Sequence, residues 1–171
     1  MAPSSGGAEY LKDWLFSITV LHRSHWNASR RYGQVNLWLG VSTSVCAAIS
    51  GTSAFSSLTG TGASIVTGTL GLIAAILAAV QTSLHASESS AEHKRAAIRF
   101  GKLRRELEEQ LAVGVPEDVD ARTAWLASFR ERWDAVDDES PAVPSRFFDQ
   151  AMRALARHVV TATPKRGDSA P

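Results

Sequence analysis

One long stretch of this chain carries no charge. The 171 residues include 18 Lys and Arg and 17 Asp and Glu, yet none of them lies between Tyr32 and Ser87, a run of 56 residues. A soluble domain of this size needs charged or strongly polar side chains at frequent surface positions. The run therefore excludes a disordered chain and argues against a plain soluble globule.

Two apolar segments lie within the uncharged run. They cover residues 35–55 and 63–84, and a break rich in Ser, Thr and Gly separates them at 56–62. As helices, each would reach about 30 Å, the thickness of a bilayer's hydrocarbon core. The alternative is a hairpin buried in a soluble bundle, but few residues remain to surround two such helices. We therefore expect two transmembrane helices joined by a short turn.

Basic residues flank the pair of expected spans, whereas the break between them has no charge. Lys12, Arg23, Arg30 and Arg31 precede the first span, and six basic residues follow the second between positions 94 and 105. By the positive-inside rule, both termini lie in the cytoplasm.

The remaining sequence predicts helices, so the expected fold is all-α: an integral membrane helical hairpin with a cytosolic helical body. Apolar residues recur at helical spacing in each segment outside the spans. The two-transmembrane domain is expected over 9–160, with unstructured ends at 1–8 and 161–171. The helices expected outside the spans cover about 9–32, 87–112, 118–137 and 145–159. The last of them is expected to turn inward a face of Phe148, Ala151, Met152, Leu155 and Val159.

Each expected span carries one stripe of small and polar residues at steps of three and four. In lipid, helices associate through such residues because small side chains allow close backbone approach. The stripe positions we take as pore-lining or helix-packing candidates are Asn36, Gly40, Thr43, Ala47 and Ser50 in the first span and Thr67, Gly71, Ala74, Ala78 and Gln81 in the second.

These stripes admit two interpretations. They can pack the hairpin against itself, or they can face water in a pore built from several hairpins. Spacing alone favours packing by roughly two to one, because membrane helix interfaces routinely use small residues. Neither span contains a charged residue, so a pore would be lined by hydroxyls, amides and small side chains and would discriminate poorly among ions.

A basic cluster follows the second span. The cluster can contact anionic lipid headgroups, as many basic segments beside a span do. Alternatively, it can form a specific phosphate-binding surface for a nucleotide ligand. Position next to a span favours the lipid by roughly three to one. The residues of this cluster are Lys94, Arg95, Arg99, Lys102, Arg104 and Arg105.

Motifs for catalysis or cofactor binding are lacking. Gly60 and Gly62 do not continue into a dinucleotide-binding pattern, and no second ligand pair at metal spacing supports His22 and His25. We therefore expect no enzyme activity, no metal and no cofactor. A net charge of +1 gives no reason to expect a nucleic-acid partner, and the single Cys46 excludes a disulfide scaffold.

The order of these segments resembles a known family. A segment rich in His and Arg at 22–32 precedes a first span that contains several polar residues. A Ser/Gly turn and a second span follow. Next come a helix with the pattern AAIRFGKLRRELE from position 96, a Trp-containing helix, the break SPAVP from position 140 and the pair Phe147-Phe148. Together they resemble the SLATT domain, the two-transmembrane effector associated with SMODS nucleotide synthases and SLOG sensors in bacteria.

The resemblance implies a homo-oligomeric, pore-forming effector of the bacterial inner membrane. In such a conflict system, often antiphage, a nucleotide second messenger or a sensor protein would trigger the membrane domain. The family has no established catalytic residues, so none is transferred to this chain. Two other hypotheses stay open at this point: a membrane-anchored scaffold that presents the cytosolic helices to a partner, and a holin-like lysis protein.

Overall fold

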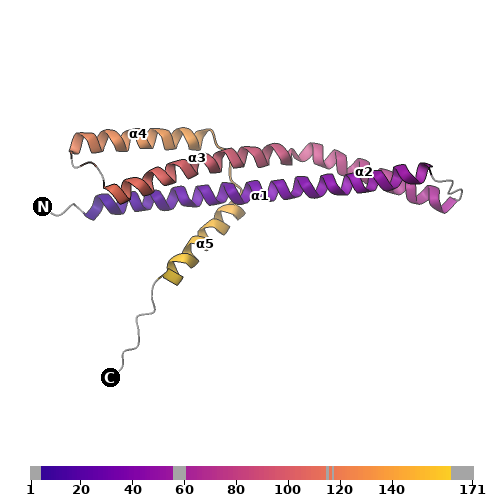
Figure 1. Ribbon diagram of the computed structural model, residues 1–171, viewed down its shortest axis with the longest axis horizontal. Helices are drawn as coiled ribbons and strands as arrows, with labels where there is room; N and C mark the ends of the chain where they lie inside the picture. The colour runs from indigo at the N-terminus through magenta and orange to yellow at the C-terminus, as the bar shows by residue number, and fades with distance from the viewer. Residues whose placement is uncertain (1–4, 56–60, 115, 117, 163–171) are drawn as a thin grey trace, which may run out of the picture. The chain divides into compact units, whose positions relative to one another are not determined.

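The computed structural model describes residues 5–55, 61–114, 116 and 118–162, and gives the side chains of 9–51, 62, 65–114, 116 and 118–157. All regular structure in these ranges is helical, as the all-α expectation required. Figure 1 shows the five helices, which are α1 (Ser5–Phe55), α2 (Thr61–Leu84), α3 (Ala86–Val113), α4 (Val119–Asp138) and α5 (Ser145–Ala162).

Helix α1 differs from the expectation in two ways. It begins at Ser5, inside the segment 1–8 that was expected to lack structure, and it runs to Phe55 without a break. The expected amphipathic helix and the expected first span are therefore parts of one helix, in which Gly33 is an interior residue. Of the expected break at 56–62, residues 56–60 lie outside the described residues, whereas Thr61 and Gly62 already belong to α2. Most of the expected tail at 161–171 also lies outside the described residues, although α5 continues to Ala162.

The chain divides into two compact units. We call residues 1–28 together with 92–171 the helical body, and residues 29–91 the hairpin unit. The first half of α1 and most of α3 thus belong to the helical body, whereas the second half of α1, all of α2 and the start of α3 belong to the hairpin unit.

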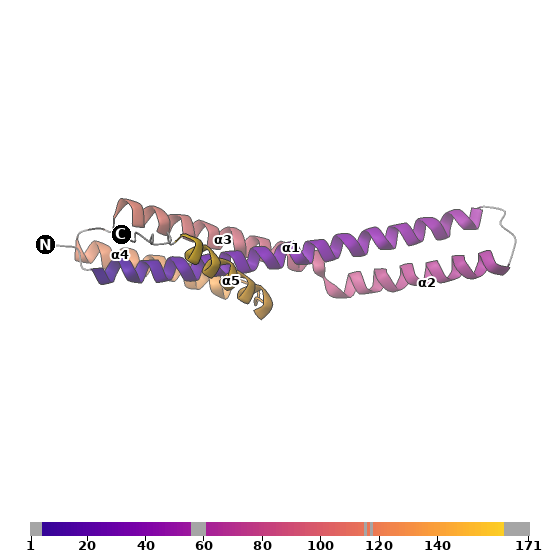
Figure 2. The same cartoon turned by 90° about the horizontal axis from the view of Figure 1, so that it is seen from below.

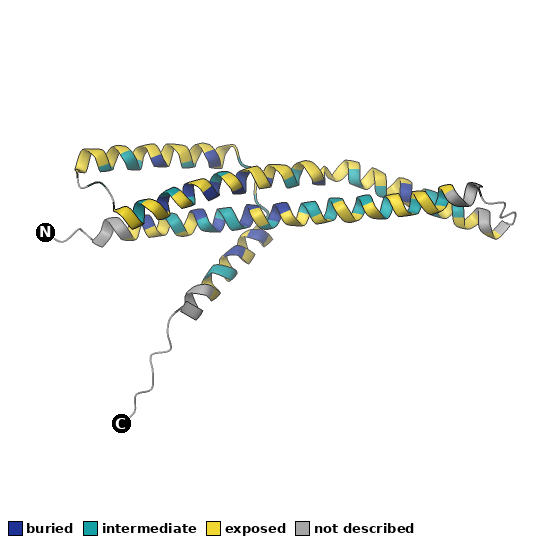
Figure 3. Ribbon diagram, viewed as in Figure 1, coloured by how far each residue is buried: buried dark blue, intermediate teal, exposed yellow. Residues whose placement is uncertain are grey.

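The helical body has a conventional apolar core, which Figure 3 shows as the dark bands on α1, α3 and α4. Phe100 and Phe129 are fully buried, and Trp14 stacks on Phe129 with ring centroids 5.7 Å apart. Burying such aromatic side chains contributes on the order of 2 kcal/mol each. The buried core residues are Leu11, Ile18, Ala96, Phe100, Leu103, Leu107, Phe129 and Val136.

The connection from α3 to α4 is fixed by local chemistry. Gly114 follows α3 with a φ of 104°, a left-handed conformation that glycine adopts without a steric cost. The Gln110 side chain donates to the Gly114 carbonyl oxygen at 2.6 Å. Asp118 then caps α4 by accepting from the Ala121 amide at 2.8 Å. These contacts set where α3 ends and α4 begins.

Helix α5 is packed on a different face from the one the sequence led us to expect. Its buried residues are Phe147 and Ala151, whereas Phe148 is 41% exposed and Met152 is 36% exposed. Phe147 and Phe148 are adjacent and therefore point about 100° apart on the helix. In Figure 1, α5 diverges from the other helices of the helical body. The expected inward face is therefore confirmed at Ala151 and wrong at Phe148 and Met152. Leu155 is half-buried, and the side chain of Val159 lies outside the described residues.

The hairpin unit has the opposite distribution of side chains. Figure 2 shows α2 lying beside the second half of α1. Among the described residues, one helical run, Ile65–Val113, is long and apolar enough to cross a membrane, and it comprises most of α2 and all of α3. Its most apolar 18-residue window has a mean hydropathy of 1.9, and 6% of that window is buried. The core helix of a soluble bundle would be mostly buried, so this low burial argues against the soluble alternative.

Candidate functional site

Small and polar residues of α1 and α2 face each other within the hairpin unit. The Gln81 side-chain amide donates to the Asn36 side-chain oxygen at 3.3 Å, and the Ser50 hydroxyl donates to the Thr67 carbonyl oxygen at 3.1 Å. A Cβ atom added at Gly71 would lie 3.3 Å from the Ser50 hydroxyl oxygen. The two predicted stripes therefore meet, and in a single chain they pack the hairpin against itself.

Not every stripe residue lies in this contact. Ala74 is buried. The Thr43 hydroxyl, by contrast, donates within its own helix, to the Leu39 carbonyl oxygen at 2.8 Å. Ala47 and Ala78 are exposed, so a single chain leaves these two positions uncovered. A Cβ at Gly40 would lie 3.5 Å from the Gln81 side chain, an ordinary contact distance.

Large apolar residues cover the outside of the hairpin unit. Trp38 and Leu72 are 69% and 63% exposed, which in water would be a considerable apolar surface. In lipid the same surface needs no cover, because lipid chains are as apolar as leucine. The exposed large residues of this unit are Leu37, Trp38, Val41, Val45, Ile49, Ile65, Val66, Leu72, Ile73, Ile76, Val80 and Leu84.

A pair of serines joins α1 to the start of α3. The Ser29 hydroxyl donates to the Ser90 carbonyl oxygen at 2.9 Å, and the Ser90 hydroxyl donates to the Ser29 carbonyl oxygen at the same distance. Nearby, a Cβ at Gly33 would lie 3.2 Å from the Ser90 hydroxyl oxygen, so a larger residue would crowd this contact. We call this reciprocal contact the serine clasp.

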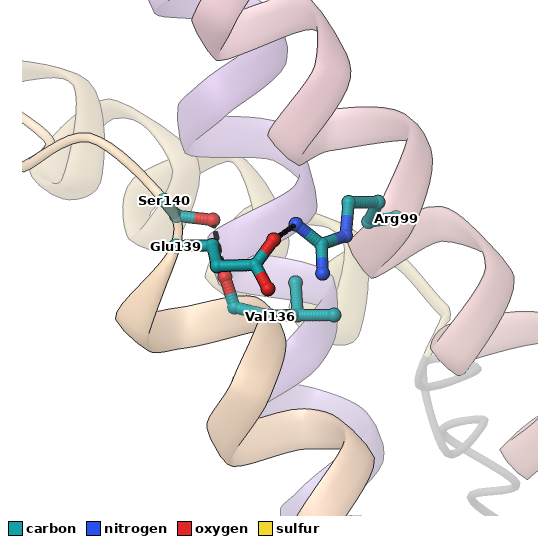
Figure 4. Close-up of polar contacts among 4 residues, drawn as sticks. All are labelled: Arg99, Val136, Glu139 and Ser140. Carbon is teal, nitrogen blue, oxygen red and sulfur yellow. Dashed lines mark hydrogen bonds and ion pairs between the residues drawn. The ribbon is translucent and has the colours of Figure 1, made fainter.

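The predicted basic cluster on α3 divides into two groups. Arg99 pairs with Glu139 at the end of α4, where Ser140 also donates to the Val136 carbonyl oxygen at 2.6 Å (Figure 4). Arg104 pairs with Glu108 at 3.6 Å along its own helix. The side chains that remain exposed are Lys94, Arg95, Lys102 and Arg105. The side chains of Arg99 and Arg104 are themselves still 37% and 31% exposed, so all six cations lie at the surface.

Two histidines form a buried pair in the helical body. The Nδ1 atoms of His25 and His93 lie 3.0 Å apart, so one ring donates and the other accepts, and the His25 ring stacks on Phe100. Burial, helped by the neighbouring His93 and His22, lowers the pKa of His25 from 6.5 to about 4. Burial also lowers the pKa of His93, although Glu92 opposes the shift. Sequence reasoning missed this pair because its members lie far apart along the chain.

A known family model matches more than half of this chain. The model described as the SMODS and SLOG-associating 2TM effector domain, in its fungal form, matches residues 18–139. The chain belongs to the SLATT family. No curated protein and no solved structure matches it. The match covers the whole hairpin unit and the helical body from residue 18 to the end of α4, and its description makes the chain a membrane effector domain.

This SLATT domain also has a surface cleft of the size of a small-ligand site. It has a volume of about 450 Å³ and lies between α3 and the end of α4. Its charged lining consists of two glutamates and two arginines, so it does not select an anion by charge. The residues around it are Glu92, Arg95, Ala96, Arg99, Glu139, Ser140 and Pro141. Within the described part of the chain, no group of three His, Cys, Asp or Glu side chains could hold a metal ion.

Proposed function

We propose that this SLATT domain is a pore-forming effector that acts as a homo-oligomer of hairpins in a conflict system such as antiviral defence. The observation that supports it is the exposure of small residues on the outside of a hairpin whose inner stripe is already packed. Ala47 and Ala78 belong to the predicted stripes yet face outward, and a Cβ at Gly68 would meet nothing within 4 Å. Such positions allow a neighbouring hairpin to approach closely.

The proposed pore opens when contacts within one hairpin are exchanged for contacts between hairpins. Asn36 and Gln81 bond to each other in the single chain, so lining a pore with these side chains requires that contact to change. This arrangement supports a closed resting hairpin that a trigger acts on through the cytosolic helices. The proposed trigger is a nucleotide second messenger or a sensor protein. The mechanism needs no catalytic residue and no cofactor.

We further propose a multi-pass topology with both termini in the cytoplasm, based on the basic residues that flank the spans. The proposed first span, 35–55, lies in α1, and part of it falls beyond Gly51, where side chains lie outside the described residues. The matching family model is labelled fungal, so the expected bacterial inner membrane has no support from the comparison. The proposal therefore concerns a cellular membrane with anionic lipid on its cytoplasmic side.

A voltage-sensitive dye in bacteria that express the chain tests pore formation directly. Strongly expressed wild-type protein should depolarise the cells even without the trigger, because a high concentration of hairpins favours their assembly by mass action. The Ala78→Leu variant changes an outward position, and overpacking a close contact costs about 1–3 kcal/mol. Assembly and depolarisation should therefore fall by about tenfold or more. The control is Ile76→Leu, which keeps both volume and exposure and should behave as wild type.

The outcomes separate the parts of the proposal. Equal depolarisation by wild type and Ala78→Leu would contradict assembly through this face. An absence of depolarisation, with the protein confirmed in the membrane, would contradict an untriggered leak. The remaining candidates would then be a triggered pore and a scaffold.

A membrane-anchored scaffold is the second candidate, and the independent core of the helical body favours it. Ion pairs such as Arg132 with Glu106 at 2.6 Å join α3 to α4 around that core, so the body presents a defined surface to a partner. Replacing both spans with unrelated transmembrane segments distinguishes the two candidates. A scaffold keeps its function after the exchange, whereas a pore loses it.

A further inference from the structure

Helix α5 presents three different faces, and the family match and the proposed pore use none of them. One face, which includes Phe147 and Ala151, is buried in the helical body. A second face is apolar and open, with Phe148 and Met152 exposed. Leu155 continues this apolar row, and Val159 occupies its next position in the sequence. Helix α5 also lies outside the residues 18–139 that match the SLATT model.

The third face of α5 is cationic. Arg146, Arg153 and Arg157 recur at steps of seven and four residues, so they share one side of the helix, and Asp149 is the single acid among the described residues of α5. These arginines border a shallow depression of about 690 Å³. By contrast, α4 carries more acids than bases. The positive charge of the C-terminal half of the helical body is therefore concentrated on α5.

We propose that α5 is an interfacial helix that lies on the anionic surface of the membrane in which the hairpin is anchored. Phe148 and Met152 would enter the boundary between headgroups and acyl chains, and the three arginines would be attracted to lipid phosphates. Helices with one apolar and one Arg-rich face bind membranes in this manner. The inference rests on the membrane residence of the chain but not on pore formation.

Charge and polarity together identify a lipid surface as the occupant of this face. A second copy of the chain would offer the acidic α4 to the arginines, but the exposed side of α4 is mainly polar and gives little apolar surface for Phe148 and Met152 to contact. An anionic bilayer can accept Phe148 and Met152, while the arginines on the opposite side of the helix extend their long side chains back toward the headgroup phosphates. Each arginine near such a surface contributes about 1 kcal/mol, which corresponds to roughly a fivefold change in binding.

The test uses the full-length chain reconstituted in vesicles. A Cys46→Ala background with Met152→Cys carries a polarity-sensitive fluorophore on the apolar face, and flotation confirms insertion of the hairpin. The vesicles contain phosphatidylcholine alone or phosphatidylcholine with phosphatidylglycerol. We expect a blue shift and quenching by lipid-attached quenchers with phosphatidylglycerol, and both effects should be lost at high salt.

Two matched variants test the contribution of charge. The double variant Arg153→Gln and Arg157→Gln loses two cations. Its apparent affinity for phosphatidylglycerol vesicles, read from the emission shift, should therefore fall by more than about tenfold. The controls are Arg130→Gln, which removes an exposed cation from α4, and the same fluorophore at Ala124→Cys on α4. Arg130→Gln should leave the emission shift of the fluorophore on α5 unchanged. The fluorophore at Ala124→Cys should show no phosphatidylglycerol-dependent shift.

Other results would overturn the inference. Identical emission in the two vesicle types would show that α5 does not bind anionic lipid. A blue shift in both vesicle types that resists salt would assign the face to a second copy of the chain. Ion leakage from the same vesicles is measured separately, so a protein that leaks nothing but shows the phosphatidylglycerol-dependent shift supports the inference while it contradicts an untriggered pore.

Discussion

In the helical body, Phe100 and Phe129 are fully buried, whereas in the hairpin unit Trp38 and Leu72 are more than half exposed and the polar Gln81 lies between helices. In both units the side chains that the surroundings solvate poorly lie inside, but water surrounds one unit and lipid surrounds the other. Water drives large apolar side chains inward in one unit. Lipid gives no such drive in the other, so close approach and polar contacts hold the helices together. Substitutions in the two units should therefore have opposite consequences.

The largest contrast is expected from truncating an apolar side chain in each unit. Phe100→Ala should lower the free energy of unfolding of the helical body by about 3–5 kcal/mol, because it leaves a cavity in a closed core. Leu72→Ala should change stability by less than about 0.5 kcal/mol. Urea unfolding in mild detergent, followed by tryptophan fluorescence, measures both. A large loss for Leu72→Ala would mean that the outside of the hairpin is not lipid-facing in the way described.

Within the hairpin unit, enlarging a glycine should be costly where the two helices are in contact and harmless where the glycine faces open space. Gly71→Leu pushes against Ser50 and should destabilise the hairpin by about 1–3 kcal/mol, whereas Gly68→Leu enters open space and should leave the hairpin of a single chain intact. Distances between spin labels on α1 and α2 report the separation of the helices. Equal separation in the two variants would argue against the observed interface.

Acid should weaken the helical body more than the hairpin unit. The folded state holds His25 neutral, with a pKa lowered to about 4 from 6.5, so the unfolded state binds the proton first as pH falls. The stability that neutral His25 contributes is therefore complete above the ordinary pKa, and it should fall by about 1 kcal/mol between pH 7 and about pH 5.5. His25→Gln should flatten this slope in urea unfolding, whereas the exposed His85→Gln should not. A slope that His25→Gln leaves unchanged would assign the acid sensitivity to other groups.

The smallest effect is expected at the polar contact between the spans. Gln81→Leu removes the hydrogen bond to Asn36, and such bonds in membrane proteins contribute about 0.6 kcal/mol on average. Thermal unfolding in detergent should shift slightly downward, and Thr82→Val, at an exposed position outside this contact, serves as the control. An increase in stability would show that packing outweighs the bond.

Local spacing predicted much of the fold. Apolar residues at helical spacing predicted the helices outside the spans, and in α3 and α4 such rows are buried, with Phe100, Leu103 and Leu107 in α3 and Phe129 and Val136 in α4. Spacing also predicted the small and polar stripes that meet in the hairpin. The membrane residence of the two expected spans rests on composition and family, and the pore remains a proposal.

Other features depend on contacts that local sequence does not encode. The helix α1 continues through Gly33 because a glycine in a helix costs only about 1 kcal/mol, which packing readily offsets. The pairing of His25 with His93 and of Arg99 with Glu139 joins distant positions. The sequence predicted that Phe148 of α5 faces inward, whereas tertiary packing buries its neighbour Phe147.

The serine clasp restricts how α1 can move against the start of α3. Its two hydrogen bonds run in opposite directions between the same pair of residues, so a shift of either helix along its axis by one residue breaks both together. A tilt about this point can keep both bonds within reach. The clasp therefore favours rocking or rotation over sliding at this position, because sliding would cost both hydrogen bonds at about 1 kcal/mol each.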